Sequence, residues 1–308
     1  MSVGYSLREN EVVYSLRENG AALIFIALLF WAGNMVAGRA TVGLVAPVTL
    51  ACMRWSIAGV IALFLARRHL KRDWPAIRAG WRPLVLLSLT GISGYNTLVY
   101  LGLQSTTAIN GFLINTTLAS VVALMCFLLF RDRLGRRAAL GLVVAMSGVV
   151  WVILGGDLTK LLSLTLNRGD LIVFAGVVCY ALYTALLRKR PDIHPMTFIA
   201  VTFILGFLFL LPFWVLEAAT GMTAVWDDPR TWSVIGYLAI FPSLVSFLCF
   251  NRGVALIGAN RASALLLMMP LVGVVLSMIF LGEALILAHV VGGMLIFAGL
   301  YIGRRKPA

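Results

Sequence analysis

Aromatic and polar side chains stand inside several long apolar stretches of this chain. Trp31 and Asn34 lie three residues apart in the first stretch, and Tyr180 and Tyr183 occupy the matching places in the second half. Residues three apart share one face of a helix. Aromatic faces can stack on a flat ligand or attract a cation. We therefore expect these four residues to line a binding wall.

One charged residue, Arg54, also lies well inside an apolar stretch, in the segment ACMRWSIAG. If that stretch crosses a membrane, the charge is costly and usually functional. Arg54 can hold a substrate carboxylate, or it can snorkel or pair with backbone carbonyls. The sequence favours neither interpretation.

Further polar residues complete the candidate binding set at similar depths in other stretches. They are Tyr95, Tyr100, Asn110, Asn115 and Ser246. Each one alone can equally be a contact between helices. Pro270, in LLLMMPLVGVVLS, removes a backbone hydrogen bond where lipid offers no replacement, so we expect it to break its helix and act as a hinge. Matching polar clusters in the two halves favour a central cavity.

The elements that position these residues are membrane-spanning helices. The 308 residues are 61% hydrophobic and only 12% charged, whereas soluble domains carry about a quarter charged residues. The apolar residues come in blocks of about 20, the length that crosses a bilayer as a helix. We predict an all-α polytopic protein with ten spans, at about 21–43, 46–66, 83–103, 109–130, 137–155, 169–188, 196–216, 231–252, 261–281 and 286–303. The hexamer YSLREN occurs twice within residues 1–20, and this segment is set apart from the fold as a cytoplasmic N-terminal segment.

Positive charge gathers on one side of the predicted spans. With the N-terminus in the cytoplasm, inside segments hold twenty Lys and Arg residues and outside segments hold four. This positive-inside bias predicts cytoplasmic termini in a cell (inner) membrane, with the basic loops against anionic headgroups. The net charge of +13 does not indicate nucleic-acid binding, because the chain has no soluble domain to present a basic face.

The two halves repeat one pattern. Residues 101–133 can be laid over 253–285 at an offset of 152, and FWAGN (30–34) over CYALY (179–183) at an offset of 149. The first repeat covers 21–155 and the second covers 169–303. Because each has five spans, an odd number, the second must be inverted in the membrane. Transporters with this architecture bind substrate near the midplane, where the copies meet.

Other classes of function lack the residues they need. No His, Cys, Asp or Glu cluster has the spacing of a metal site, and no Ser–His–acid set can meet in one layer, so we expect neither an enzyme, nor a cofactor, nor a bound metal. No Asp or Glu lies deep in a predicted span. We therefore expect transport that is not obligatorily coupled to an ion through a membrane carboxylate.

The segments LLFWAGNMVAGR, APVTLACMRWSIAG and MMPLVGVVLSMIFLGEAL resemble the EamA-type drug/metabolite transporter superfamily. The resemblance covers roughly 18–303, and Trp31, Asn34, Arg54 and Pro270 are among the matching residues. It implies a ten-helix exporter of small organic metabolites, most similar to the YddG-like amino-acid exporters. One departure is Thr117–Leu118, which stands where many members have a proline matching Pro270.

The residues and the resemblance together predict an exporter of neutral and aromatic amino acids that works by alternating access around a central aromatic cavity. The alternative within transport is efflux of hydrophobic cationic drugs, since aromatic faces suit them. An essential Arg54 would favour substrates with a carboxylate.

Overall fold

The computed structural model describes residues 3–131, 135–157, 159, 167–221, 223–257, 265–266 and 268–303. Within these ranges the secondary structure is helical, and a bridge between Val45 and Ala224 is the one isolated β-bridge. Each apolar stretch thus closes its backbone hydrogen bonds within its own helix, as lipid requires. The predicted all-α membrane fold is confirmed.

Both halves follow the same order of helices. The first half consists of α1 (Val3–Ala40), α2 (Pro47–Ala79), α3 (Trp81–Leu87), the π-helix η1 (Ser88–Gly94), α4 (Tyr95–Gly102), α5 (Ala108–Thr116), α6 (Leu118–Phe130) and α7 (Arg136–Ile153). The second half consists of α9 (Arg168–Leu186), the short 3-10 helix η2 (Leu187–Lys189), α10 (Pro195–Ala219), α11 (Pro229–Ile240), the π-helix η3 (Phe241–Val245), α12 (Ser246–Ile257), α14 (Met269–Leu281) and α15 (Leu287–Gly303). Each predicted span contains at least one of these helices.

The helices differ in how clearly they span a membrane by length. Six helical stretches are long and apolar enough, and the pair α5–α6 makes a seventh span with a bend of 47°. Shorter apolar helices at α7, α14 and α15 lie in the fifth, ninth and tenth predicted spans. Two helices extend beyond their predicted spans. α1 begins at Val3, so the segment set apart in the sequence is helical, and α2 continues to Ala79 because Lys and Arg are good helix formers.

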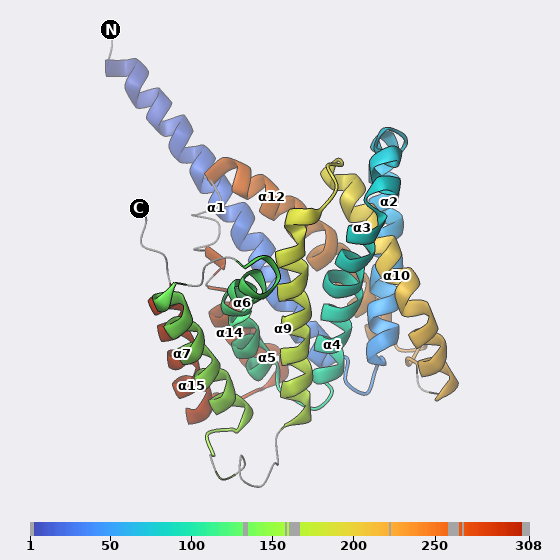
Figure 1. Cartoon of the computed structure of the whole chain (residues 1–308), viewed down its shortest axis with the longest axis vertical. Helices are drawn as coiled ribbons and strands as arrows, with labels where there is room; N and C mark the ends of the chain where they lie inside the picture. The colour runs from blue at the N-terminus through green and yellow to red at the C-terminus, as the bar shows by residue number, and fades with distance from the viewer. Residues whose placement is uncertain are drawn as a thin grey trace.

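The main contacts between helices follow the repeat, so that a contact made by one helix has an equivalent contact made by its counterpart in the other repeat. α2 packs on its counterpart α10, and α7 packs on its counterpart α15. α1 packs on α12 and α14, while its counterpart α9 packs on α4 and α6. Figure 1 shows α7 beside α15 at one edge and α2 beside α10 at the other, with the remaining helices between them.

The two repeats are inverted relative to each other. Glu217, near the end of α10, binds the backbone at Val48 and Thr49, at the start of α2. Asp73, near the end of α2, binds the backbone N–H of His194, just before α10. Counterpart helices therefore run antiparallel, as in an inverted repeat.

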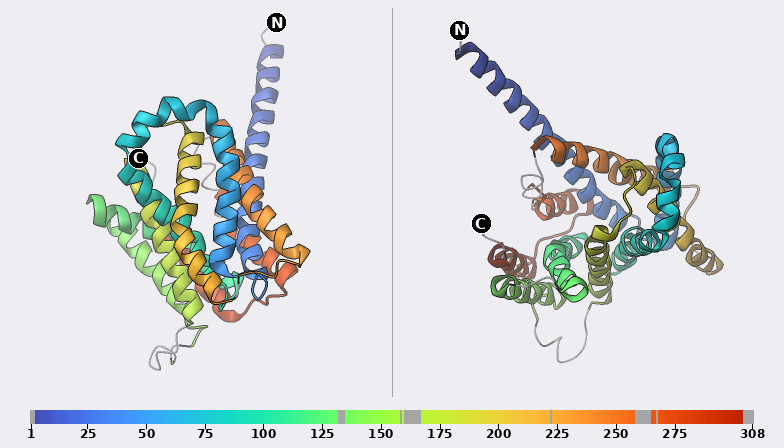
Figure 2. Two further views of the ribbon diagram at one scale, coloured as in Figure 1. Left: turned by 90° about the vertical axis from the view of Figure 1, so that its right-hand side faces the viewer. Right: turned by 45° about the horizontal axis from the view of Figure 1, so that its top comes forward.

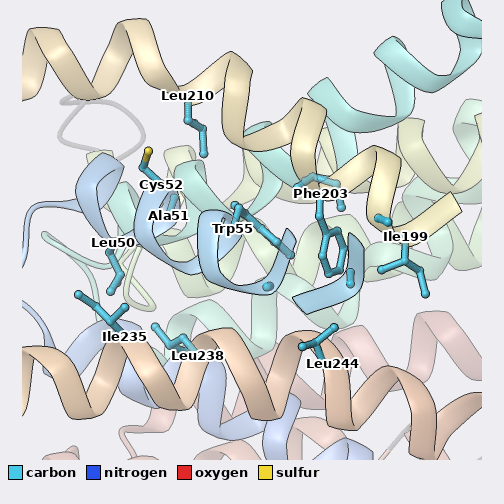
Figure 3. Close-up of a cluster of buried hydrophobic side chains, with 14 of the residues drawn as sticks. Leu50, Ala51, Cys52, Trp55, Ile199, Phe203, Leu210, Ile235, Leu238 and Leu244 are labelled. Carbon is cyan, nitrogen blue, oxygen red and sulfur yellow. The ribbon is translucent and has the colours of Figure 1, made fainter. Parts of the chain in front are cut away.

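Both chain ends lie toward the same end of the helix bundle (Figure 2). The opposite end, where α1 and α10 finish and where α2, α5 and α9 begin, is called the distal face below. Figure 3 shows how α2 is held beneath α10 and above α11. Trp55 of α2 packs on Phe203 of α10 with ring centroids 4.6 Å apart, and Ile235 and Leu238 of α11 close the other side. This core fixes the rotation of α2 and so the direction of its polar side chains.

The ninth span is broken just before Pro270, because residues 265–266 are helical, Met268 lies in a turn and α14 begins at Met269. Pro270 is the second residue of α14, where its missing N–H has no partner within the helix in any case. The fourth span breaks at the equivalent place, because α5 ends at Thr116 and α6 begins at Leu118. The break thus occurs in both repeats, with proline in the ninth span, as the sequence predicted, and without proline in the fourth. Whether the break acts as a hinge stays a prediction.

Because Pro270 lies in the first turn of α14, Pro270→Ala should have a small effect. We expect the free energy of unfolding to change by less than about 1 kcal/mol, since no internal hydrogen bond is gained at the start of a helix. Thermal unfolding in detergent measures this. Pro212→Ala, inside α10, is the matched control that restores a helix-interior hydrogen bond and should raise the melting temperature. A large loss of transport in folded Pro270→Ala protein would instead support a hinge at the proline.

Candidate functional site

Arg54 is the centre of a polar network that joins the two repeats. Its side chain is only 4% exposed. Nη1 donates hydrogen bonds to Asn34 Oδ1 (2.6 Å) and Asn96 Oδ1 (2.8 Å) and to the Tyr100 hydroxyl (2.5 Å). Nε donates to Ser243 Oγ (2.8 Å), across the repeat interface in η3. Side chains from three elements, α1, α4 and η3, therefore hold one guanidinium group.

The charge of Arg54 is not balanced by an acid among the described residues. All of its hydrogen-bond acceptors are neutral side-chain oxygens, and Nη2 donates no hydrogen bond to the part of the chain that the structure describes. The ring of Trp55 lies 4.4 Å from the guanidinium carbon and adds a weak attraction. Burying an ion without a counter-ion costs several kcal/mol. An anionic group of a ligand would lower that cost.

The first aromatic group of the site lies between α1 and the part of the eighth span formed by η3 and α12. Trp31 Nε1 donates to the backbone carbonyl of Pro242 (3.1 Å), and the Trp31 ring lies 5.3 Å from the ring of Phe250. The hydrogen bond satisfies the indole N–H and fixes the direction of the ring. Its apolar face is then available for packing.

The second aromatic group consists of Tyr95, Tyr180 and Tyr183, from α4 and α9. The rings of Tyr95 and Tyr180 are 4.6 Å apart, and those of Tyr180 and Tyr183 are 5.2 Å apart. The Tyr95 hydroxyl donates to Asn115 Oδ1 (3.0 Å), at the end of α5. Tyr183 lies directly on Gly91 in η1, where an added Cβ would be 2.3 Å from its ring. A glycine is therefore required for this packing.

The two aromatic groups are equivalent under the repeat. Trp31 and Tyr180 are related by the offset of 149, and both lie against the third helical span of the opposite repeat. Those two spans carry the π-helices η1 and η3, a distortion that is common at functional sites. Asn34 follows Trp31 by one helical turn and Asn96 follows Tyr95 directly, so the Arg54 network connects both groups.

Three predicted residues lie elsewhere. Asn110 is near the start of α5, where its amide binds Asp170 at the distal face. Ser246 is fully buried and donates to the carbonyl of Phe241, within the distortion of η3. Pro270 lies at the start of α14, as described above.

Of the other predicted residues, Arg54 contacts Asn34 and Tyr100. Tyr95 contacts Asn115 and Tyr180, and Tyr180 contacts Tyr183. Trp31 packs on Phe250 one helical turn from Asn34.

Asn96 and Ser243 bind Arg54 but are not among the residues predicted from the sequence. The spacing of Asn96 and Tyr100, four residues apart on one helix face, could have indicated Asn96. No local signal indicates Ser243, because its contact with Arg54 depends on how α2 and η3 pack.

Carboxylates join the two repeats at the distal face. Glu217 accepts hydrogen bonds from the backbone of Val48 and Thr49, and Glu283 accepts from the backbone of Ala108 and Ile109 (2.7 and 2.9 Å). Both acids are in the second repeat and both cap a helix of the first, where the helix dipole favours negative charge. Asp132, at the end of the fourth predicted span, lies outside the described residues.

Residues 18–154 and 167–303 match the EamA-like transporter family, one domain in each half. The chain belongs to the EamA-like transporter family. It is thus a multi-pass membrane transporter and not an enzyme. A likeness to known relatives extends along the whole chain.

Relatives of this EamA-like transporter include the uncharacterized transporter YyaM of Bacillus subtilis, 28% identical over 90% of this chain and 92% of that protein. A protein of Streptantibioticus cattleyicolor named probable terminal-alkyne amino-acid exporter is 25% identical over 92% of this chain and 95% of its own length. A solved crystal structure matches with a TM-score of 0.60 and 18% identity, over 92% of this chain and 96% of its own. At that identity the match shows the fold alone.

No group of three or more His, Cys, Asp or Glu side chains could hold a metal ion within the described ranges. The four cysteines carry free thiols, and Cys52 is packed among apolar side chains between α2 and α10. The chemistry of the site is therefore that of recognition, by one cation, neutral hydrogen-bonding groups and aromatic faces.

Proposed function

We propose that this EamA-like transporter exports small neutral amino acids, aromatic ones included, as in the YddG-like exporters. The observation that carries the proposal is the buried guanidinium of Arg54, which among the described residues has no acidic partner and no hydrogen-bond acceptor for Nη2. A carboxylate matches the planar guanidinium in both charge and geometry. A substrate carboxylate would thus supply the missing negative charge.

The two aromatic groups also support an amino-acid substrate. Trp31 and Phe250 come from one repeat interface, and Tyr95, Tyr180 and Tyr183 come from the other. A substrate ring can stack on these faces, and a substrate ammonium is attracted to them. The printed name of the Streptantibioticus relative, an amino-acid exporter, agrees with this substrate class.

The direction of transport rests on charge. The segments predicted to be inside hold twenty Lys and Arg residues against four in the segments predicted to be outside, which supports cytoplasmic termini and an outward-facing distal side in the inner membrane. Arg39 at the end of α1 donates to the carbonyl of Leu103 (2.6 Å), and the Glu217 and Glu283 caps add further links across this side. Export by alternating access would require these distal contacts to break when the distal side opens.

The proposal is tested by counterflow in proteoliposomes that hold purified wild-type protein. Labelled L-phenylalanine should exchange, whereas labelled phenethylamine, which has the same ring and ammonium but no carboxylate, should not. Exchange of phenethylamine without phenylalanine would favour efflux of hydrophobic cations instead, and exchange of neither compound would contradict the proposed substrate class.

The aromatic wall makes a second prediction. Trp31→Ala and Tyr183→Ala should each lower phenylalanine exchange by up to about tenfold, since an aromatic contact contributes about 0.5–1.5 kcal/mol beyond its area. Arg230→Gln, in an exposed pair with Asp228, is the control that should leave exchange unchanged. If both alanine variants kept wild-type exchange, the assignment of the central site would be wrong.

A further inference from the structure

Asp170 is a buried acid that the transport site does not use. The sequence places it at the outer side of the sixth span, but the structure buries it completely, as the third residue of α9. The backbones around it are in close contact, since an added Cβ on Gly169 would be 2.6 Å from the carbonyl oxygen of Gly102. The expectation that transport proceeds without a membrane carboxylate must therefore be reconsidered at this position.

The partners of Asp170 come from the opposite repeat and are all neutral. Asn110 Nδ2 lies 3.1 Å from Oδ1 and 3.0 Å from Oδ2 of the carboxylate, and the Thr106 hydroxyl donates to Oδ1. The carboxylate therefore ties the start of α9 to the start of α5. Meanwhile the amide oxygen of Asn110, Oδ1, is buried without a donor in the described part of the chain.

No positive charge contacts this carboxylate among the described residues. Arg39 binds the carbonyls of Leu103 and Gln104, and Arg168, two residues before Asp170, forms no ion pair with it. Glu283 binds the start of α5, and Tyr100 of α4 binds Arg54 and Asn34. Residues 103–107 and α5 carry no titratable side chain. Burying the ionised form here is costly, because neutral hydrogen bonds replace only part of its hydration.

The chemistry of the partners distinguishes Asp170 from the two glutamates of the distal face. Glu283 accepts two backbone N–H groups, which can only donate, and so does Glu217, which also accepts from the Thr49 hydroxyl; protonation would therefore remove backbone hydrogen bonds that hold each of them. A hydroxyl and a primary amide can both donate and accept. If Asp170 is protonated, its O–H can donate to the Asn110 oxygen after the amide turns over, or to Thr106. This group of three residues is thus suited to both protonation states.

We propose that Asp170, with Asn110 and Thr106, is a proton-binding site at the junction of the two repeats, and that proton uptake favours closure of the distal face. Closure removes Asp170 from water, and the neutral acid costs less to bury than the carboxylate. The closed form therefore binds the proton more tightly, and acid on the distal side shifts the transporter toward closure. Tight packing around hydrogen-bond donors favours a proton over a metal cation.

Proton binding can be measured without any substrate, by infrared difference spectroscopy of the protein in proteoliposomes. On acidification of wild-type protein we expect the carbonyl band of a buried protonated carboxylic acid. Asp170→Asn, which is nearly isosteric and neutral, should lose that band. Glu283→Gln is the matched control, because it removes an acid from the same face and should keep the band. A band that persists in Asp170→Asn, or no such band in wild type, would overturn the proposal.

Linkage to closure is measured by the distance between spin labels at Val42 and Leu285, exposed distal positions in the two repeats, in a variant without the four native cysteines. Acid should increase the short-distance population in the wild-type background. In Asp170→Asn the short-distance population should be as large at every pH tested as it is in the wild-type background at acid pH. Glu283→Gln should keep the response to pH. A response that is unchanged in Asp170→Asn would show that Asp170 is not the group that links pH to closure. Neither measurement depends on which substrate is exported.

Discussion

Replacing Arg54 by glutamine should reduce phenylalanine exchange by about ten- to a hundredfold in folded protein. The substitution keeps a side chain that can hydrogen bond to Asn34 and Ser243 but removes the positive charge. A hydrogen bond to a charged group contributes about 1.5–3 kcal/mol, and 1.4 kcal/mol corresponds to a factor of ten. Counterflow of labelled phenylalanine in proteoliposomes is the measurement.

The variant Arg54→Lys separates charge from geometry. Lysine keeps the charge but cannot donate in a plane to several acceptors at once, so we expect exchange between that of wild type and that of Arg54→Gln. If both variants exchanged phenylalanine as wild type does, Arg54 would be a structural group only. The amino-acid proposal would then lose the observation on which it depends, although membership of the EamA-like family would stand.

Adding one methyl group at Gly299 should destabilise the fold strongly. A Cβ at this position of α15 would be 2.4 Å from the backbone nitrogen of Ala145 and 2.5 Å from the carbonyl oxygen of Gly141, both in α7. Backbone atoms cannot rotate away as a side chain can, so the two helices must separate. We expect Gly299→Ala to lower the free energy of unfolding by about 1–3 kcal/mol, the usual range for overpacking.

A second glycine provides the control for this prediction. An added Cβ at Gly236, in α11, would meet nothing within 4 Å. Since alanine is the better helix former by about 0.5–1 kcal/mol, Gly236→Ala should raise the melting temperature while Gly299→Ala lowers it. Thermal unfolding of the two variants in one detergent measures both. A stabilising effect of Gly299→Ala would show that α7 and α15 are not in backbone contact.

These two predictions concern different parts of the repeat architecture. Gly299 lies where counterpart helices pack on each other, which holds the two repeats together. Arg54 lies where both repeats meet around the polar network. A change at Gly299 should therefore lower the free energy of unfolding. A change at Arg54 should instead lower the transport activity of protein that is still folded.

The sequence by itself determined the membrane class, the positions of the spans and the repeat. Long apolar blocks leave the backbone no partner but itself, so helix follows from composition alone. The match of Trp31 with Tyr180 and the odd number of spans in each half predicted inverted repeats, and the antiparallel pairing of α2 with α10 agrees. The deep position of Arg54 in its span was also readable, because a charge interrupts an apolar run.

Only the tertiary structure decided which polar groups meet. The contact of Arg54 with Ser243 depends on the rotation of α2 against η3, which the apolar core of Trp55 and Phe203 fixes. The burial of Asp170 depends on the docking of α9 against residues 102–110, far away in the sequence. The break at Pro270 was expected from the sequence, whereas the equivalent break at Thr117, which has no proline, was seen only in the structure. Hydropathy records how apolar a segment is and not which neighbour its polar face meets, so such pairings follow from packing.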